Sequence, residues 1–379
     1  MRRVFIKTSF AALIILALLF AVTVTTYANE DEILNDFKNL IDEMPDDVKD
    51  RLPDDMENKE SIEKGVLEFT QISYILSVIK EILGVEFASS SRLFAALVGL
   101  IAILGISGAA KNSFGDSAIP MAVRFAGVSA VMLTVVQTQY ECLLKVKEYF
   151  EQLNGIMLGM IPITGTVWAM GGNVSTASVG SATMYVFFNI SQLVFGNTVL
   201  PMAALGTCLA FCNGISPDME LKRVSGALRK TYLFLIGAVV TVFGAILSTQ
   251  TMITAASDCA TARTAKFISA SVIPIVGGSV GDSLRTVASG IQYIKSILGV
   301  GGIAMIFLAV LPVLISLLLT RLALSLASGI AGFFGCGEIG GLLGELSEVY
   351  SSVVAAVAMT GVMFILTLFI FIKTAVAIA

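Results

Sequence analysis

The chain has 379 residues, of which 56% are hydrophobic and 14% are charged, whereas ordinary soluble domains carry about 25% charged residues. This composition excludes a soluble globular protein and predicts an all-α, polytopic helical membrane protein. The sequence contains no histidine, which excludes Ser–His and Cys–His nucleophiles, His-ligated metals and histidine proton relays. The five cysteines are odd in number and scattered through apolar sequence, so they define no disulfide framework.

Residues 1–28 have the features of a secretory signal peptide. Three basic residues (Arg2, Arg3 and Lys7) precede an apolar core at 10–24, and small residues lead up to Ala28, after which we expect cleavage. The alternative is an uncleaved anchor helix, because the apolar core is nearly long enough to span a bilayer. Both interpretations place residue 29 onward outside the cytoplasm.

Residues 29–60 form an acidic segment. Residues 29–68 carry fifteen Asp or Glu and five Lys or Arg, a net charge of −10, against +3 for residues 69–379. The carboxylate pairs at 46–47 and 54–55 lack the glycine and the spaced glutamate of an EF-hand calcium loop. The composition therefore predicts a solvated, partly disordered extracytoplasmic arm.

Residues 61–91 carry apolar side chains at steps of three and four, which is typical of one amphipathic helix. We expect this helix to lie on the membrane or to dock against the transmembrane bundle.

Residues 92–379 form the polytopic transmembrane region. A hydrocarbon core of about 30 Å needs about 20 apolar residues per helix, which predicts about seven spans here. One element is expected to be re-entrant or broken. Residues 171–184 are small and polar, and because such backbone at membrane depth lies inside protein or beside a cavity, they form either a short loop or a re-entrant segment. The stretches without charge are 93–110, 125–140, 152–217, 231–256, 267–281, 296–320, 322–336 and 349–372, and the fifth of these is short and interrupted by Pro274.

A helix with basic residues is predicted after residue 216. Ser216 suits its N-cap, Pro217 suits its first turn, and the acidic and basic residues lie at the ends favoured by the helix dipole. By the positive-inside rule this helix is cytoplasmic and offers a surface to a cytoplasmic partner. If the acidic arm is external and this helix is cytoplasmic, the chain crosses the membrane an odd number of times between them. This favours three spans over four before residue 216. The basic residues are Lys222, Arg223, Arg229 and Lys230.

Charged residues, a proline and glycines gather between residues 250 and 295. Intramembrane charges persist mainly when they are paired or face a cavity, and proline with glycine permits irregular backbone. Asp258 and Asp282 would also suit an aspartyl protease dyad, but the G-x-G-D pattern of presenilin-like proteases is missing because Ser279 occupies the first glycine position. The candidates for a pathway or a packing site are Gln250, Asp258, Arg263, Lys266, Pro274, Gly277, Gly278, Asp282 and Lys295.

The order of residues across this segment is specific. It runs through residues 248–250 (Ser-Thr-Gln), Asp258, residues 263–267 (Arg-Thr-Ala-Lys-Phe), residues 273–278 (Ile-Pro-Ile-Val-Gly-Gly), Asp282, Lys295 and Gly299. In this order the chain resembles the stage III sporulation protein AE family, and the resemblance extends over most of the chain, including a turn at residues 160–162. Two departures are the loosely kept Gly-Gly-Ser-Thr pattern at 171–176 and Glu338, near which the family pattern has a proline.

The resemblance implies a role in endospore formation. Members of the family are expected in the mother-cell membrane around the engulfed forespore, within a channel or secretion-like complex that supports forespore development. The implied partners are other proteins of the same operon, including a secretion-type ATPase and ring-forming proteins, together with a forespore-membrane partner. This chain would be the polytopic core, or permease, of that complex.

No cofactor, metal, nucleic acid or enzymatic activity is expected for this chain. It has no nucleotide-binding loop, so a partner would supply any ATP drive. Two other functions remain open. One is an independent secondary transporter of a small solute, which would bind its substrate at broken helices near residues 274–278. The other is a structural assembly factor that uses its glycines for helix packing alone.

Overall fold

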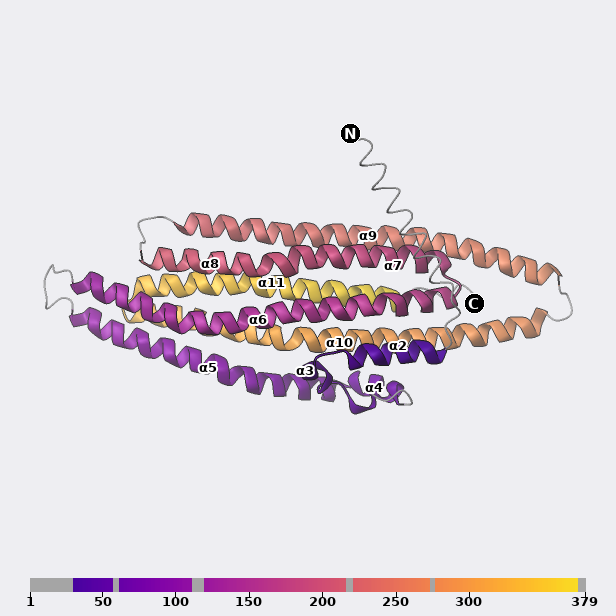
Figure 1. Ribbon diagram of the computed structural model, residues 1–379, viewed down its shortest axis with the longest axis horizontal. Coiled ribbons are helices and arrows are strands. Elements are labelled where there is room, and N and C mark those ends of the chain that lie inside the picture. The colour runs from indigo at the N-terminus through magenta and orange to yellow at the C-terminus, as the bar shows by residue number, and fades with distance from the viewer. Residues whose placement is uncertain (1–29, 57–60, 111–118, 216–220, 273–276, 374–379) are drawn as a thin grey trace, which may run out of the picture.

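The computed structural model describes residues 30–56, 61–110, 119–215, 221–272 and 277–373. Within these ranges some residues are described by their backbone alone: 30–32, 47, 107–110, 119–121, 123–124, 175–176, 221–222, 249–272 and 277–288. Throughout these ranges the regular structure is helical, which confirms the all-α prediction. The long helices run side by side along one axis and form an elongated bundle (Figure 1). They are α5 (Ile72–Ala110), α6 (Ile119–Met170), α7 (Val174–Ser191), α8 (Asn197–Ile215), α9 (Leu221–Val272), α10 (Gly277–Phe333) and α11 (Gly337–Lys373).

Six segments of the described chain are long and apolar enough to cross a membrane, where the sequence predicted about seven. The difference arises because stretches 296–320 and 322–333 both lie on α10. Stretches 125–140 and 152–170 likewise share α6, but the rest of the third stretch supplies a separate segment at 177–215. The charged residues between these stretches do not end the helices, since each further residue of an existing helix adds a backbone hydrogen bond. Three of the six segments precede residue 216, as the orientation argument required.

Residues 171–184 are not a re-entrant segment. Residues 171–173 form a tight turn in which Gly172 has φ 76°, a conformation that glycine adopts without strain. The backbone N–H of Asn173 donates to the carbonyl oxygen of Trp168 at 2.9 Å, and helix α7 starts at the next residue. The irregular element lies further on, where the π-helical turn η3 (Gln192–Gly196) joins α7 to α8. Pro162 lies inside α6 rather than in a turn.

The acidic arm is folded in its described part, so the prediction of partial disorder is wrong for residues 30–56. It forms α2 (Glu30–Asp42), α3 (Asp46–Lys49) and the 3₁₀ turn η1 (Asp54–Met56). Apolar side chains at helical spacing are buried, including Ile33, Phe37 and Ile41. They pack beside α6 and α10 (Figure 1). Acidic residues lie on the same short helices as these buried apolar residues, so the composition alone did not reveal the apolar face.

Residues 61–91 form two helices rather than one. Helix α4 (Ile62–Phe69) ends at Thr70, and the remainder is the first half of α5. The ring of Phe69 contacts the ring of Phe307 on α10 edge to face, with centroids 6.1 Å apart. The α4 part therefore docks against the bundle, one of the two expected placements.

Helices α10 and α11 form the central pair of the bundle, joined by a turn at Gly335, whose φ is 71°. Close packing between them depends on glycine. A Cβ added at Gly361 would lie 2.8 Å from Cγ2 of Val310, and one added at Gly299 would overlap Ile372. Small residues at such positions let helix backbones approach closely in membrane proteins.

Candidate functional site

A band of polar side chains crosses the bundle at one level, in helices that are otherwise apolar. Direct contacts join its members from helix to helix, and on each helix they lie within about two turns, or about 10 Å. We call this set the polar layer. It consists of Glu86 on α5; Gln139, Cys142 and Lys145 on α6; Thr207 and Asn213 on α8; Arg229 on α9; Thr320 and Arg321 on α10; and Glu345, Ser347 and Glu348 on α11.

Helix α6 supplies one half of the polar layer. The Lys145 ammonium pairs with the Glu86 carboxylate on α5 at 2.7 Å. Nearly two turns away, the buried Gln139 amide donates to the Thr207 hydroxyl on α8, which donates in turn to a backbone carbonyl of its own helix. The Cys142 sulfur lies 3.8 Å from the Thr320 hydroxyl on α10. Buried polar groups are tolerated because they are hydrogen-bonded in this way.

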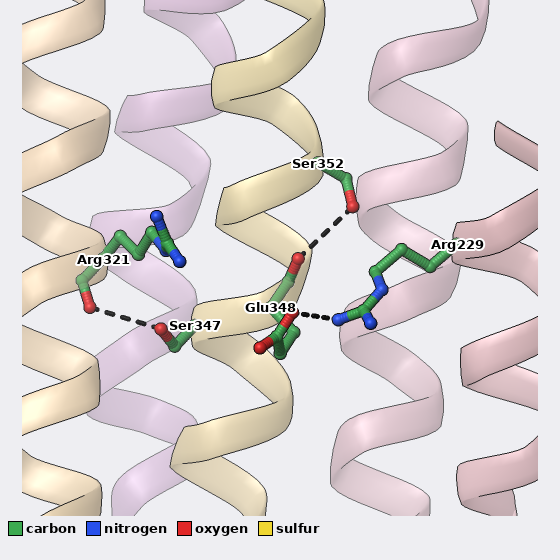
Figure 2. Close-up of polar contacts among 5 residues, drawn as sticks. All are labelled: Arg229, Arg321, Ser347, Glu348 and Ser352. Carbon is green, nitrogen blue, oxygen red and sulfur yellow. Dashed lines mark hydrogen bonds and ion pairs between the residues drawn. The ribbon is translucent and has the colours of Figure 1, made fainter. Parts of the chain in front are cut away.

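Helix α11 supplies the other half and stands between two arginines, as Figure 2 shows. On one side the Arg229 guanidinium of α9 donates to the Glu348 carboxylate. On the other side the Ser347 hydroxyl donates to the backbone carbonyl oxygen of Arg321 at 3.4 Å. One turn towards the start of α11, the Asn213 amide of α8 donates to the Glu345 carboxylate at 2.5 Å. Three helices thus meet at two carboxylates on one face of α11.

A pocket of about 430 Å³ opens beside these carboxylates, between α8, α9 and α11. Its charged groups are Arg229, Glu345 and Glu348. Glycines from α8, α9 and α11 supply part of its wall, so no side chains fill the space there. The lining residues are Val199, Met202, Ala203, Gly206, Ser225, Gly226, Leu228, Arg229, Tyr232, Gly341, Gly344, Glu345, Glu348, Val349, Ser352 and Val353.

The pocket brings one guanidinium together with two carboxylates, and Glu345 also accepts from the Asn213 amide. The Arg229–Glu348 pair itself is partly open, with side-chain exposures of 37% and 56%. Open ion pairs of this kind contribute only about 0.2–1 kcal/mol to stability, so stability alone gives little reason for the pair.

The structure divides the predicted basic surface. Arg223 and Lys230 are exposed on α9, whereas Arg229 is turned towards α11 and belongs to the polar layer. The side chain of Lys222 lies outside the described part of the chain. The helix that carries these residues is also longer than expected, because α9 continues without a break from Leu221 to Val272.

Most of the predicted centre at 250–295 lies outside the side chains that the structure describes. Backbone positions put Gln250, Asp258, Arg263 and Lys266 on α9, and Gly277, Gly278 and Asp282 at the start of α10. Pro274 lies outside the described residues. These two helix ends extend past the neighbouring helices at one end of the bundle (Figure 1).

Lys295 is described and does not lie beside Asp282. It is thirteen residues further along α10, or about 20 Å. Its side chain is buried, with 1% of its surface exposed, and its ammonium lies 5.6 Å from the centre of the Phe371 ring on α11. A cation over an aromatic face is stabilised by the quadrupole of the ring. Lys295 therefore joins α10 to α11 at Phe371.

Sequence reasoning missed the carboxylates of α11 and their partners on α8 and α9. A signal for them was present, since Glu345 and Glu348 are three residues apart in an otherwise apolar stretch and so share one helix face. Within the described ranges, no group of three or more Cys, Asp or Glu is arranged to hold a metal ion.

The family model for stage III sporulation protein AE matches residues 56–375. The stage III sporulation protein AE of Bacillus subtilis (strain 168) is 25% identical over 285 residues, which cover 75% of this chain and 71% of that protein. No solved structure matches the chain. Because the family model covers most of its length, this chain belongs to the stage III sporulation protein AE family.

Proposed function

We propose that this protein is a membrane component, and the permease core, of a channel or secretion-like complex between the mother cell and the forespore, which supports forespore development after engulfment. It lies in the mother-cell membrane around the forespore. The observation that carries this proposal is the polar layer, which joins six helices of an apolar bundle beside a pocket of about 430 Å³. Polar and ionisable groups at membrane depth are typical of solute and ion pathways.

The proposed partners follow from the same role. The chain is proposed to act without enzymatic chemistry of its own and to work with a secretion-type ATPase and ring-forming proteins on either side of the membrane. The exposed Arg223 and Lys230 on α9 are the proposed contact for the cytoplasmic partner. The acidic arm packs against α6 and α10, and it is the proposed contact for extracytoplasmic partners.

Neutralising the Arg229–Glu348 pair should stop sporulation without removing the protein from the membrane. The double variant Arg229→Gln, Glu348→Gln leaves no unpaired charge from this pair, and the pair itself contributes at most about 1 kcal/mol to stability. We expect wild-type abundance together with a drop in heat-resistant spores of about tenfold or more. Spore counts and immunoblots of membranes from the complemented deletion strain measure both quantities.

An exposed pair on α6 provides the matched control. Lys147 and Glu151 lie 3.5 Å apart, one turn from each other and open to the surface, so Lys147→Gln with Glu151→Gln should sporulate normally. If the Arg229 and Glu348 double variant also sporulates normally, the polar layer is a packing device and the permease role is wrong.

The orientation is tested with a reporter enzyme that is active only outside the cytoplasm. Fused after Lys230, it should be inactive, because the basic residues of α9 favour the cytoplasmic side. Fused after Asp50, it should be active, because the arm follows the signal peptide. Activity of the Lys230 fusion, with the protein intact, would overturn both the orientation and the cytoplasmic contact.

A further inference from the structure

A row of aromatic rings crosses the bundle, and it begins at α4, beside the N-terminal arm. The ring of Phe69 on α4 contacts the ring of Phe307 on α10, with centroids 6.1 Å apart. Three residues further along α10, Val310 packs against Gly361 of α11. Because α10 and α11 run antiparallel, Phe364, three residues after Gly361, lies at the level of Phe307.

From Phe364 the row continues to the other side of the bundle. Its ring contacts the ring of Phe187 on α7, with centroids 6.2 Å apart, and Phe187 stacks on Phe243 of α9 at 3.8 Å. The rings therefore lie at one level along the bundle. On α9, α10 and α11 this level is near the middle of a charge-free stretch long enough to cross a hydrocarbon core. These stretches are 231–256, 296–320 and 349–372.

The two ends of the row lie on opposite faces of the bundle, with α9 along one edge and α4 along the other (Figure 1). The face at α9 is apolar. Residues 231–248 carry no charge, and Phe234 and Val242 are 74% and 58% exposed. Helix α7, which packs beside α9, has no charged residue either. A face of this composition is suited to contact with lipid.

The opposite face is charged at the same level. It is formed by α2, α3, η1 and α4, and we call it the arm face. On α4, the side chains of Glu63, Lys64 and Glu68 are all exposed, within two turns of Phe69. Charged groups at membrane depth are costly against lipid, and they face protein or a water-filled cavity instead. The exposed charged residues of the arm face are Asp36, Asp42, Glu43, Asp46, Asp50, Asp54, Glu63, Lys64 and Glu68.

We propose that the arm face borders a water-filled space at the depth of the bilayer, which the arm faces of further copies of this chain close on the other side. Lipid cannot cover the arm face while it covers the α9 face at the same level. Copies related by a rotation axis along the membrane normal place their arm faces at one depth. Residues 29–68 carry a net charge of −10, so these faces repel one another and stay apart, with water between them.

The test uses the full-length protein in a background without native cysteines, reconstituted into phospholipid vesicles with one spin label on each chain. Leu67→Cys places the label on the arm face, and Val242→Cys places it on the α9 face. The two side chains are a matched pair, because each is 58% exposed and each lies within two residues of the aromatic row. Neither change alters a charge. Collision with a polar nickel complex reports water, and collision with oxygen reports the bilayer interior.

The label at position 67 should collide with the nickel complex about tenfold or more often than the label at position 242, because polar solutes are excluded from hydrocarbon. The label at 242 should collide mainly with oxygen. Magnetic coupling between copies should be stronger for labels at 67, which face inward, and dilution with unlabelled protein should remove it. The experiment measures no transport, so its outcome is independent of the proposed permease role.

Three results would each overturn the proposal. Frequent nickel collisions at position 242 would place the α9 stretch outside the bilayer. Rare nickel collisions with frequent oxygen collisions at position 67 would show that lipid covers the arm face. Coupling at 67 that is absent, or weaker than at 242, would show that the arm faces of different copies do not face one another.

Discussion

Gly301→Val should detach the N-terminal arm from the bundle while the bundle stays folded. A Cβ at Gly301 of α10 would lie 2.6 Å from Cζ of Phe37 and 3.3 Å from Cε of Met56. Phe37 is fully buried, and losing the packing of a buried phenylalanine costs about 3–5 kcal/mol. Other buried contacts of the arm, such as Leu40 against Gly159 of α6, oppose its release, so the loss should raise the released fraction of the arm. A cysteine placed at Ile41, which is also fully buried, should then react with a maleimide in a background without native cysteines.

Two further variants separate release of the arm from general damage. Gly290→Val introduces the same side chain on the same helix, where a Cβ meets no atom within 4 Å, and it should leave the cysteine protected. In Gly301→Ala alone, the cysteine at position 41 should react partly with the maleimide. Adding Phe37→Leu should protect this cysteine again, because the smaller leucine side chain leaves room for the new Cβ at position 301. Protection of the cysteine in Gly301→Val would show that the arm does not depend on this contact.

Tyr149→Ala should be the most destabilising single change within the transmembrane bundle. Tyr149 on α6 is 1% exposed, and its hydroxyl donates to the backbone carbonyl of Val357 on α11 at 3.0 Å. Removing the ring leaves a cavity and also removes this hydrogen bond between the helices, for an expected cost of about 3–5 kcal/mol. Tyr149→Phe keeps the ring and loses only the hydrogen bond, for about 1 kcal/mol.

Denaturant titration of the purified protein in mixed micelles measures this series. Tyr140→Ala is the matched control, because Tyr140 lies on the same helix and is 65% exposed, so its loss should change the unfolding free energy little. If Tyr149→Ala and Tyr140→Ala have equal effects, Tyr149 does not join α6 to α11 in the folded protein.

Patterns of charge and hydropathy along the chain were sufficient to predict the membrane class, the helical fold and three apolar segments before residue 216. They misjudged segments in which charge and apolar spacing coexist. Residues 141–151 read as a break between spans, yet they continue α6 because Lys145 has a carboxylate partner on α5. The arm was expected to be partly disordered from its net charge, yet Phe37 and Ile41 share one buried face.

The candidate site was harder to predict than the fold. Single residues such as Arg229 were correctly noticed as unusual, but Arg229 was assigned to a surface because its partner was not visible. Glu348 lies 119 residues away along the chain, and Glu345 meets Asn213 across 132 residues. Such pairs cannot be derived from local spacing.

The amino-acid sequence by itself determined the class of apolar helical protein, because transfer of side chains between water and lipid depends on composition over about 20 residues. It also determined the family, through the order of charged and proline residues. Only the tertiary structure decided which charges meet. Helix packing places the polar residues of α6, α8, α9, α10 and α11 at the same height in the bundle. The height at which each helix packs against its neighbour depends on close contacts such as that of Val310 with Gly361. These contacts join residues far apart in the chain, so they exist only once the helices have packed.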